Sequence, residues 1–219
     1  MHSSIKNYQD IIRLIKLKIE GQNINKFPKI IAVTKTFALD DILPLIEYGH
    51  LDYGENKVQE AIDKWSEIKI KKPEIKLHLI GKLQTNKVKF AIKIFDFIHS
   101  VDSMKLAKKI SDEEIKQNKK VKIFIQVNIG SEQQKSGVDI DKIGELLNFC
   151  KELKLDVIGL MCIPPANQKS NKYFEKTNLL NSNFNLKQIS MGMSSDYLEA
   201  VINDATYLRI GSSIFGKRY

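Results

Sequence analysis

The chain has 219 residues, of which 42% are apolar, and it carries a formal net charge of +9. That length can bury one large core, and no apolar stretch is long enough to cross a bilayer, so we expect a single cytoplasmic domain over residues 1–219. The only arginines among its 35 basic residues are Arg13, Arg209 and Arg218, and the lysines are scattered over predicted helix faces. Scattered lysine is typical of a solvated surface, so we expect no nucleic-acid partner.

The cysteines and histidines lack the spacing of a metal site. Cys150 and Cys162 form no CxxC pair, and no two histidines have HxxxH spacing. We therefore expect two buried free thiols and no metal, with a disulfide or a metal-binding pair as the alternative.

Along the chain, strand-like and helix-like segments alternate after an N-terminal helix. Apolar residues at helical spacing run from Ile11 to Ile19, Gly21 ends that pattern and Pro28 blocks its resumption. The expected strands are 29–34, 51–54, 76–80, 96–100, 122–128, 156–161, 187–189 and 206–210. Helical patterns follow them, among them 39–48, 55–69, 103–117, 139–151 and 194–203.

Strands rich in Ile and Val that are separated by helices predict parallel pairing under helical cover. Eight such units close most naturally as a (β/α)8 barrel, so the expected fold class is α/β, a single-domain TIM barrel with an extra N-terminal helix. The loops at the carboxyl ends of the strands then meet on the face that carries the chemistry in this fold. The polar stretch 164–172 is the strongest loop signal, and it is expected on that face.

Lys35 stands at the end of the first expected strand, directly after an apolar run. Desolvation favours the neutral form of a lysine, and a neutral lysine is a nucleophile towards an aldehyde. The alternative is a side chain that reaches from the strand end into water.

Serine- and glycine-rich segments follow the seventh and eighth expected strands, where this fold repeatedly binds phosphate. Their small polar residues are Ser190, Ser194, Gly211, Ser212 and Ser213. Hydroxyl and backbone N–H donors there suit an anion, although these serines are also typical of turns and helix caps, Ser194 in particular. Together with Lys35, the two segments predict an aldehyde cofactor with a phosphate group.

Strand parity places Arg209 inside the barrel. Leu208 and Ile210 share one face and would pack on the helices, which leaves Tyr207 and Arg209 pointing inward. A buried arginine needs an acceptor, and a pyridine nitrogen would serve. Because arginine stays protonated, that ring nitrogen would remain neutral and the ring would be a poor electron sink. The alternative is an ion pair between Arg209 and a carboxylate.

Several motifs in combination are highly specific: AVTK at 32–35, GENKVQE at 54–60, HLIGKLQTNK at 78–87 and SMGMS at 190–194. Through them the chain resembles, over nearly its whole length, the YggS/PROSC family of pyridoxal-phosphate-binding homeostasis proteins. The resemblance implies a fold like the N-terminal barrel of alanine racemase, with pyridoxal 5'-phosphate (PLP) held as a Schiff base on Lys35. It further implies that Arg209 faces the pyridine nitrogen, that Asn56 lies against the ring, and that Gly211, Ser212 and the Ser190 segment cradle the phosphate.

The resemblance also implies a role in intracellular vitamin B6 homeostasis without strong catalytic activity, with PLP-dependent apoenzymes as candidate recipients of the cofactor. An alanine-racemase-type enzyme needs a second base from a separate β-domain, which we expect this chain to lack because it ends soon after the eighth strand. The alternative is a PLP-dependent racemase or related enzyme that finds its second base within the barrel at Tyr53, Tyr207 or His78. We expect a monomer, although no residue pattern decides the oligomeric state.

Two polar features stay open. In the 81–87 loop, Gln84 and Asn86 cap the next helix, or Lys82, Asn86 and Lys87 guard the mouth of the cofactor site or meet a carboxylate. Gln126 and Asn128 share an inward parity and either form a polar floor or satisfy each other in the core.

Overall fold

The computed structural model describes residues 2–22, 24, 26–132, 134 and 136–216. Eight parallel strands close into a barrel in the order in which they occur along the chain. The strands are β1 (Lys29–Val33), β2 (Asp52–Glu55), β3 (Lys76–Leu79), β4 (Phe97–Val101), β5 (Lys122–Val127), β6 (Asp156–Cys162), β7 (Gln188–Met193) and β8 (Tyr207–Ile210). Pairing of Lys29 with Tyr207 joins β1 to β8 and closes the ring. The expected (β/α)8 barrel is therefore confirmed.

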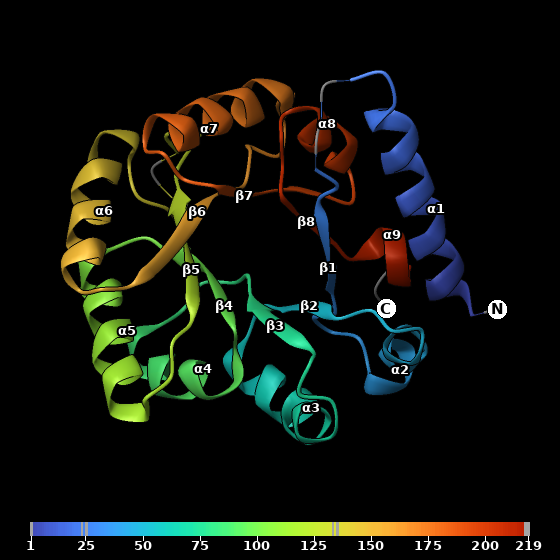
Figure 1. Cartoon of the computed structure of the whole chain (residues 1–219), viewed down its shortest axis with the longest axis horizontal. Helices are drawn as coiled ribbons and strands as arrows, with labels where there is room; N and C mark the ends of the chain where they lie inside the picture. The colour runs from blue at the N-terminus through green and yellow to red at the C-terminus, as the bar shows by residue number, and fades with distance from the viewer. Residues whose placement is uncertain (1, 23, 25, 133, 135, 217–219) are drawn as a thin grey trace.

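Helices surround the ring of strands, as Figure 1 shows. They are α1 (Ser3–Ile19), α2 (Leu39–Glu47), α3 (Val58–Lys71), α4 (Val88–Ile94), α5 (Met104–Gln117), α6 (Ile143–Glu152), α7 (Asn171–Asn183), α8 (Tyr197–Ile202) and α9 (Ser212–Phe215), with 3-10 turns η1 (Thr85–Lys87) and η2 (Ile140–Lys142). The extra N-terminal helix α1 packs against α2, α8 and α9, so both ends of the chain meet on one side of the barrel. None of these helices combines the length and apolar character needed to cross a membrane.

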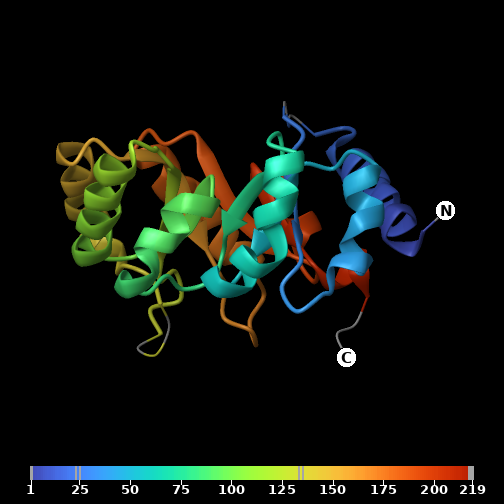
Figure 2. The ribbon, with the colours of Figure 1, turned by 90° about the horizontal axis from the view of Figure 1, so that it is seen from below.

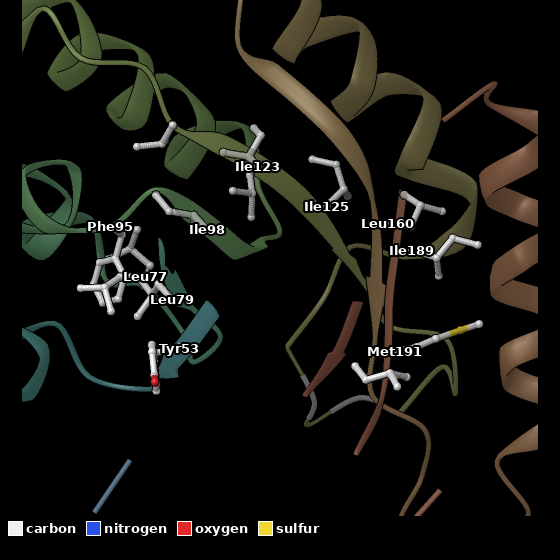
Figure 3. Close-up of a cluster of buried hydrophobic side chains, with 14 of the residues drawn as sticks. Tyr53, Leu77, Leu79, Phe95, Ile98, Ile123, Ile125, Leu160, Ile189 and Met191 are labelled. Carbon is white, nitrogen blue, oxygen red and sulfur yellow. The ribbon is translucent and has the colours of Figure 1, made fainter. Parts of the chain in front are cut away.

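The strands separate two layers of buried side chains. An inner cluster fills the barrel and consists of Ile31, Phe97, Phe124, Met161 and Tyr207. The larger outer layer lies between strands and helices, and Figure 3 shows part of it, with Ile123 and Leu160 directed towards the helices. Leu208 and Ile210 belong to this outer layer and Tyr207 to the inner cluster, so the predicted parity of β8 is confirmed.

The prediction for the seventh strand was too short. Ser190 to Met193, expected as a loop, continue β7, where Ser190 pairs with both Met161 of β6 and Tyr207 of β8. Serine and glycine are weak strand formers, but in a closed barrel a strand gains backbone hydrogen bonds on both sides, and this outweighs local preference. Gly192 takes a positive φ of 84° inside the irregular part of the β7–β8 pairing, a conformation that favours glycine.

Cys150 and Cys162 are both buried and unpaired, as expected. Burial raises the pKa of the Cys150 thiol to about 12 and that of the Cys162 thiol to about 11. Both therefore remain thiols at neutral pH and pack as small apolar groups.

Candidate functional site

A cavity of about 390 Å³ lies at the carboxyl ends of β1, β7 and β8. Its lining residues are Val33, Lys35, Asn56, Ile80, Ile163, Met193, Ser194, Ser195, Arg209, Gly211 and Ser212. Six of the residues predicted for a cofactor site thus share one cavity, although they come from distant parts of the sequence. A neighbouring cavity of about 290 Å³ shares Asn56, Ile80 and Ile163 with the first. In Figure 2, the loop that follows β5 and the loop that follows β6 both extend from one side of the barrel, the side of the carboxyl ends of the strands.

Lys35 lies in the turn that directly follows β1, and it is half-buried. The next residue, Thr36, has a φ of 68°, in the left-handed region. Such a turn needs support, since a threonine in this region is strained. The backbone N–H of Thr36 donates to Glu60 Oε1 at 2.6 Å, and Lys64 Nζ donates to the carbonyl oxygen of Thr34 at 2.8 Å.

Beneath this turn, the side chain of Glu55, the last residue of β2, connects the residue that follows β1 to α3. Its buried Oε1 accepts hydrogen bonds from Thr34 Oγ1 at 2.7 Å, Lys64 Nζ at 2.9 Å and Trp65 Nε1 at 3.0 Å. Lys64 also donates to Glu60 at 3.1 Å. Both glutamates of the 54–60 motif therefore hold the turn that presents Lys35, directly through Thr34 and Thr36 and indirectly through Lys64, a role that the sequence did not reveal.

Arg209 is a buried cation at the wall of the cavity, only 4% exposed. Its guanidinium donates to Ser190 Oγ at 2.7 Å and to the carbonyl oxygen of Cys162 at 2.9 Å. Burial lowers the pKa of Arg209, but an arginine stays protonated at physiological pH. No carboxylate of the described chain forms an ion pair with it, so the ion-pair alternative is not found. A charge of this kind, with five N–H donors and two protein acceptors, fits a ligand that brings a further acceptor into the cavity.

Ser194 joins the two segments predicted to hold a phosphate. Its Oγ accepts from the backbone N–H groups of Gly211 at 3.2 Å and Ser213 at 3.3 Å, and Ser213 Oγ donates to the Ser194 carbonyl oxygen. Ser194 and Ser212 line the cavity, whereas Ser213 does not. The N-cap of α8 is Asp196, so the expectation of Ser194 as a helix cap was wrong. Hydroxyls and backbone N–H groups at this corner are a donor set that suits an anion.

Ser190 differs from its prediction. It is fully buried and does not line the cavity, because its position within β7 turns the side chain into the barrel. Its Oγ accepts from Arg209 and lies 2.9 Å from His99 Nδ1. Ser190 therefore binds Arg209 from the interior of the barrel, and its side chain does not reach the cavity where a phosphate would lie.

The candidate second bases lie away from the cavity lining. Tyr53 and His78 are fully buried, and Tyr207 belongs to the inner cluster. Burial raises the pKa of the Tyr207 hydroxyl to about 12, raises the pKa of Tyr53 still further, and lowers the pKa of His78. Neither tyrosine is thus prepared to give up a proton at neutral pH.

The 81–87 loop passes close to the backbone of Asn56, and this explains why position 81 is a glycine. A Cβ on Gly81 would lie 2.4 Å from the backbone oxygen of Asn56, closer than any side chain tolerates. Gln84 occupies the N-cap position of η1 without a side-chain hydrogen bond, so its predicted cap is not found, and Asn86 lies inside η1. Lys82 lines the neighbouring cavity.

Gln126 and Asn128 organise the loop after β5. Gln126 Nε2 donates to the carbonyl oxygen of Ser136, while Asn128 exchanges hydrogen bonds of 3.1 Å with the backbone of Glu132. They also line the neighbouring cavity, which agrees with the polar floor and not with two side chains that satisfy each other.

Comparison with known proteins identifies relatives along nearly the whole chain. The family model of the alanine racemase N-terminal domain matches residues 16–219. The pyridoxal phosphate homeostasis protein of Aquifex aeolicus is 36% identical over 200 residues, which cover 87% of this chain and 87% of the relative. The protein of the same name from Escherichia coli strain K12 is 32% identical over 201 residues, or 86% and 85% of the two chains.

Among solved structures, PipY of Synechococcus elongatus PCC7942 with PLP bound matches with a TM-score of 0.81 at 31% identity. The match covers 92% of this chain and 100% of PipY.

Proposed function

Since this chain belongs to the alanine racemase N-terminal domain family and, within it, to the YggS/PROSC group of pyridoxal phosphate homeostasis proteins, we propose that it binds PLP in the 390 Å³ cavity and serves vitamin B6 homeostasis. The observation that carries the proposal is the meeting of Lys35, Arg209 and the Ser194 corner in that cavity. An amine, a cation and an anion-binding corner are the three groups that an aldehyde, a pyridine nitrogen and a phosphate require.

Each side chain has a distinct part in this proposal. Lys35 holds the aldehyde carbon as a Schiff base. Ser194, Gly211 and Ser212 receive the phosphate, and Ser213 acts indirectly by keeping Ser194 in place. Asn56 lies against the ring.

Arg209 donates to the ring nitrogen. PLP supplies an electron sink to enzymes when its ring nitrogen is protonated, and an arginine partner keeps that proton on the guanidinium. The absence of Tyr53, Tyr207 and His78 from the cavity lining supports the same conclusion, namely that this protein is not a strong catalyst. PLP-dependent apoenzymes are the recipients to which such a monomeric carrier would deliver its cofactor.

Covalent trapping tests the assignment of Lys35. Borohydride reduction of the PLP-loaded protein, followed by peptide mapping, should place the pyridoxyl group on Lys35, and Lys35→Ala should carry none. Lys82→Ala, which changes a lysine in the neighbouring cavity, is the matched control and should label like the wild type. A pyridoxyl group on another lysine in the wild type would contradict the proposal.

Hydrogen exchange tests the absence of strong catalysis. The PLP-loaded protein, incubated with a panel of amino acids in deuterated water, should exchange α-hydrogen no faster than Lys35→Ala. Exchange that requires Lys35 would instead favour a racemase or a related enzyme.

A further inference from the structure

A continuous chain of hydrogen bonds runs through the interior of the barrel and ends at Arg209. Asp52 Oδ1 lies 3.0 Å from His78 Nε2, and His78 Nδ1 lies 3.0 Å from His99 Nε2. His99 Nδ1 then lies 2.9 Å from Ser190 Oγ, which accepts from Arg209 at 2.7 Å. The five side chains come from β2, β3, β4, β7 and β8.

This chain connects two regions of the barrel. Asp52 begins β2 and is 18% exposed in its side chain, and it lines a separate cavity of about 310 Å³ with Lys29 and His50. Arg209 lies near the carboxyl end of β8, at the wall of the proposed cofactor cavity. A substitution at Asp52 can therefore act on Arg209 without touching the cavity itself.

Both imidazoles are held firmly and uncharged. His78 stacks on Phe97 at a centroid distance of 4.2 Å, and His99 stacks on Phe124 at 4.3 Å. Burial lowers the pKa of His78, although Asp52 opposes this; burial, with His78 and Arg209 nearby, lowers the pKa of His99 well below its ordinary value. Each ring is then neutral, with one donor and one acceptor nitrogen.

The residues at the two ends of this hydrogen-bond chain determine the direction in which its hydrogen bonds are donated. Arg209 can only donate, and an ionised Asp52 can only accept. His78 Nε2–H therefore donates its hydrogen bond to Asp52, which leaves His78 Nδ1 to accept from His99 Nε2. His99 Nδ1 in turn accepts the hydroxyl hydrogen of Ser190, whose oxygen lone pairs remain for Arg209.

We propose that Asp52, His78 and His99 are positioning residues that act through Ser190 to fix the direction in which Arg209 donates into the cofactor cavity. The inference rests on the proposed function in one respect, the contact of Arg209 with the ring nitrogen of PLP. It assigns a role to His78, the first residue of the 78–87 motif, and to His99.

The direction of the chain can be observed without any cofactor. Nitrogen-15 NMR of the ligand-free protein should show both His78 and His99 as neutral rings protonated at Nε2 at about pH 8, above the ordinary imidazole pKa of about 6.5. A proton on Nδ1 of either ring would overturn the assigned direction.

The positioning role is tested with two ligands, PLP and its 1-deaza analogue, in which a C–H group replaces the ring nitrogen. The wild type should prefer PLP by about tenfold, which corresponds to one hydrogen bond from a charged donor. His99→Phe keeps a ring against Phe124 but removes both hydrogen bonds, so it should lose most of that preference while binding the analogue as the wild type does. Met161→Leu changes a residue of the inner cluster that takes no part in the chain of hydrogen bonds, so it should keep the preference.

The outcomes separate this inference from the proposed function. If the wild type lacks the preference, or if Arg209→Met retains it, the contact of Arg209 with the ring nitrogen is wrong and the inference falls with it. Suppose instead that Arg209→Met loses the preference. If His99→Phe then keeps the preference, or weakens the binding of PLP and of the analogue equally, only the positioning role is overturned. Should His99→Phe fail to fold, Asp52→Ala at the partly exposed end decides: a preference reduced about threefold supports the role, and an unchanged one overturns it.

Discussion

Arg209 carries a charge in a place where desolvation costs several kcal/mol. Its protein acceptors, Ser190 Oγ and the carbonyl oxygen of Cys162, are neutral dipoles and compensate only in part. A buried charge that is only partly compensated contributes more to the binding of a ligand than to the stability of the ligand-free barrel. The arginine is thus a residue at which binding and stability oppose each other.

Arg209→Met should therefore leave the ligand-free protein as stable as the wild type or raise its melting temperature, since an apolar side chain of similar length removes the buried charge. The same variant should show a smaller rise in melting temperature on addition of PLP. Thermal denaturation with and without PLP measures both effects. A ligand-free variant destabilised by more than about 2 kcal/mol would show that Arg209 is mainly structural.

At the scale of elements, the turn after β1 depends on the start of α3. Thr36 in that turn and Lys64 in α3 both donate to Glu60, and Lys64 extends the contact to Glu55. Helix α3 therefore acts as a support for the strand end that presents Lys35. Because the contacts involve ionised groups, the support depends on pH.

The pH dependence of this support has a definite sign. Burial alone would raise the pKa of Glu60, but hydrogen bonds from Thr36 and Lys64 outweigh it and the pKa is lowered. A lowered pKa in the folded state means that the unfolded state binds the proton more readily, so stability is present at neutral pH and is lost as the pH falls through the folded pKa. The difference in unfolding free energy between wild type and Glu60→Gln should be largest near pH 7 and shrink below about pH 4. Denaturant titrations over this range would contradict the prediction if the difference did not change.

The 81–87 loop offers a second prediction for an element. Gly81→Ala places a Cβ against the backbone of Asn56, so either the loop or the cavity wall must move. We expect a loss of about 1 to 3 kcal/mol of stability together with weaker PLP binding.

The matched control for this substitution is Gly144→Ala in α6. Its Cβ would meet only the ring of Phe184 at 3.4 Å, and alanine favours a helix. This control should keep both stability and affinity. Equal effects of the two substitutions in calorimetry and PLP titration would rule out a special role for Gly81.

For the whole molecule, closure of the barrel makes the two ends of the chain depend on each other. β1 pairs with β8, and α1 packs against α8 and α9 (Figure 1). Removing either end opens the sheet and exposes two strand edges at once. The described chain should therefore behave as one cooperative unit.

Calorimetry should accordingly show a single unfolding transition, with equal calorimetric and van't Hoff enthalpies. PLP at 100 times its dissociation constant should stabilise the whole transition by about 2.7 kcal/mol, because it binds the folded state. Two transitions, of which PLP shifts only one, would show that the cavity belongs to a part that unfolds separately.

Local patterns in the sequence were sufficient for the barrel, for Lys35 at a strand end and for the inward direction of Tyr207. Alternation of strands and helices and the two-residue period of a strand are properties of short segments, so they can be recognised without knowledge of the rest of the chain. The motifs added the cofactor, because their combination is specific to one family. The same parity, applied to β3 and β4, would also have placed His78 and His99 inside the barrel.

Only the tertiary structure decided which polar residues line the cavity and which lie beneath it. Ser190 and Ser194 are four positions apart, yet one supports Arg209 and the other faces the cavity, because β7 continues through Ser190 and its pairing with β8 shifts before Met193. The links from Glu55 to Lys64 and from Asp52 to His78 likewise join different elements. Contacts of this kind depend on strand register and on closure of the sheet, which are set by the packing of the whole barrel and not by any one segment.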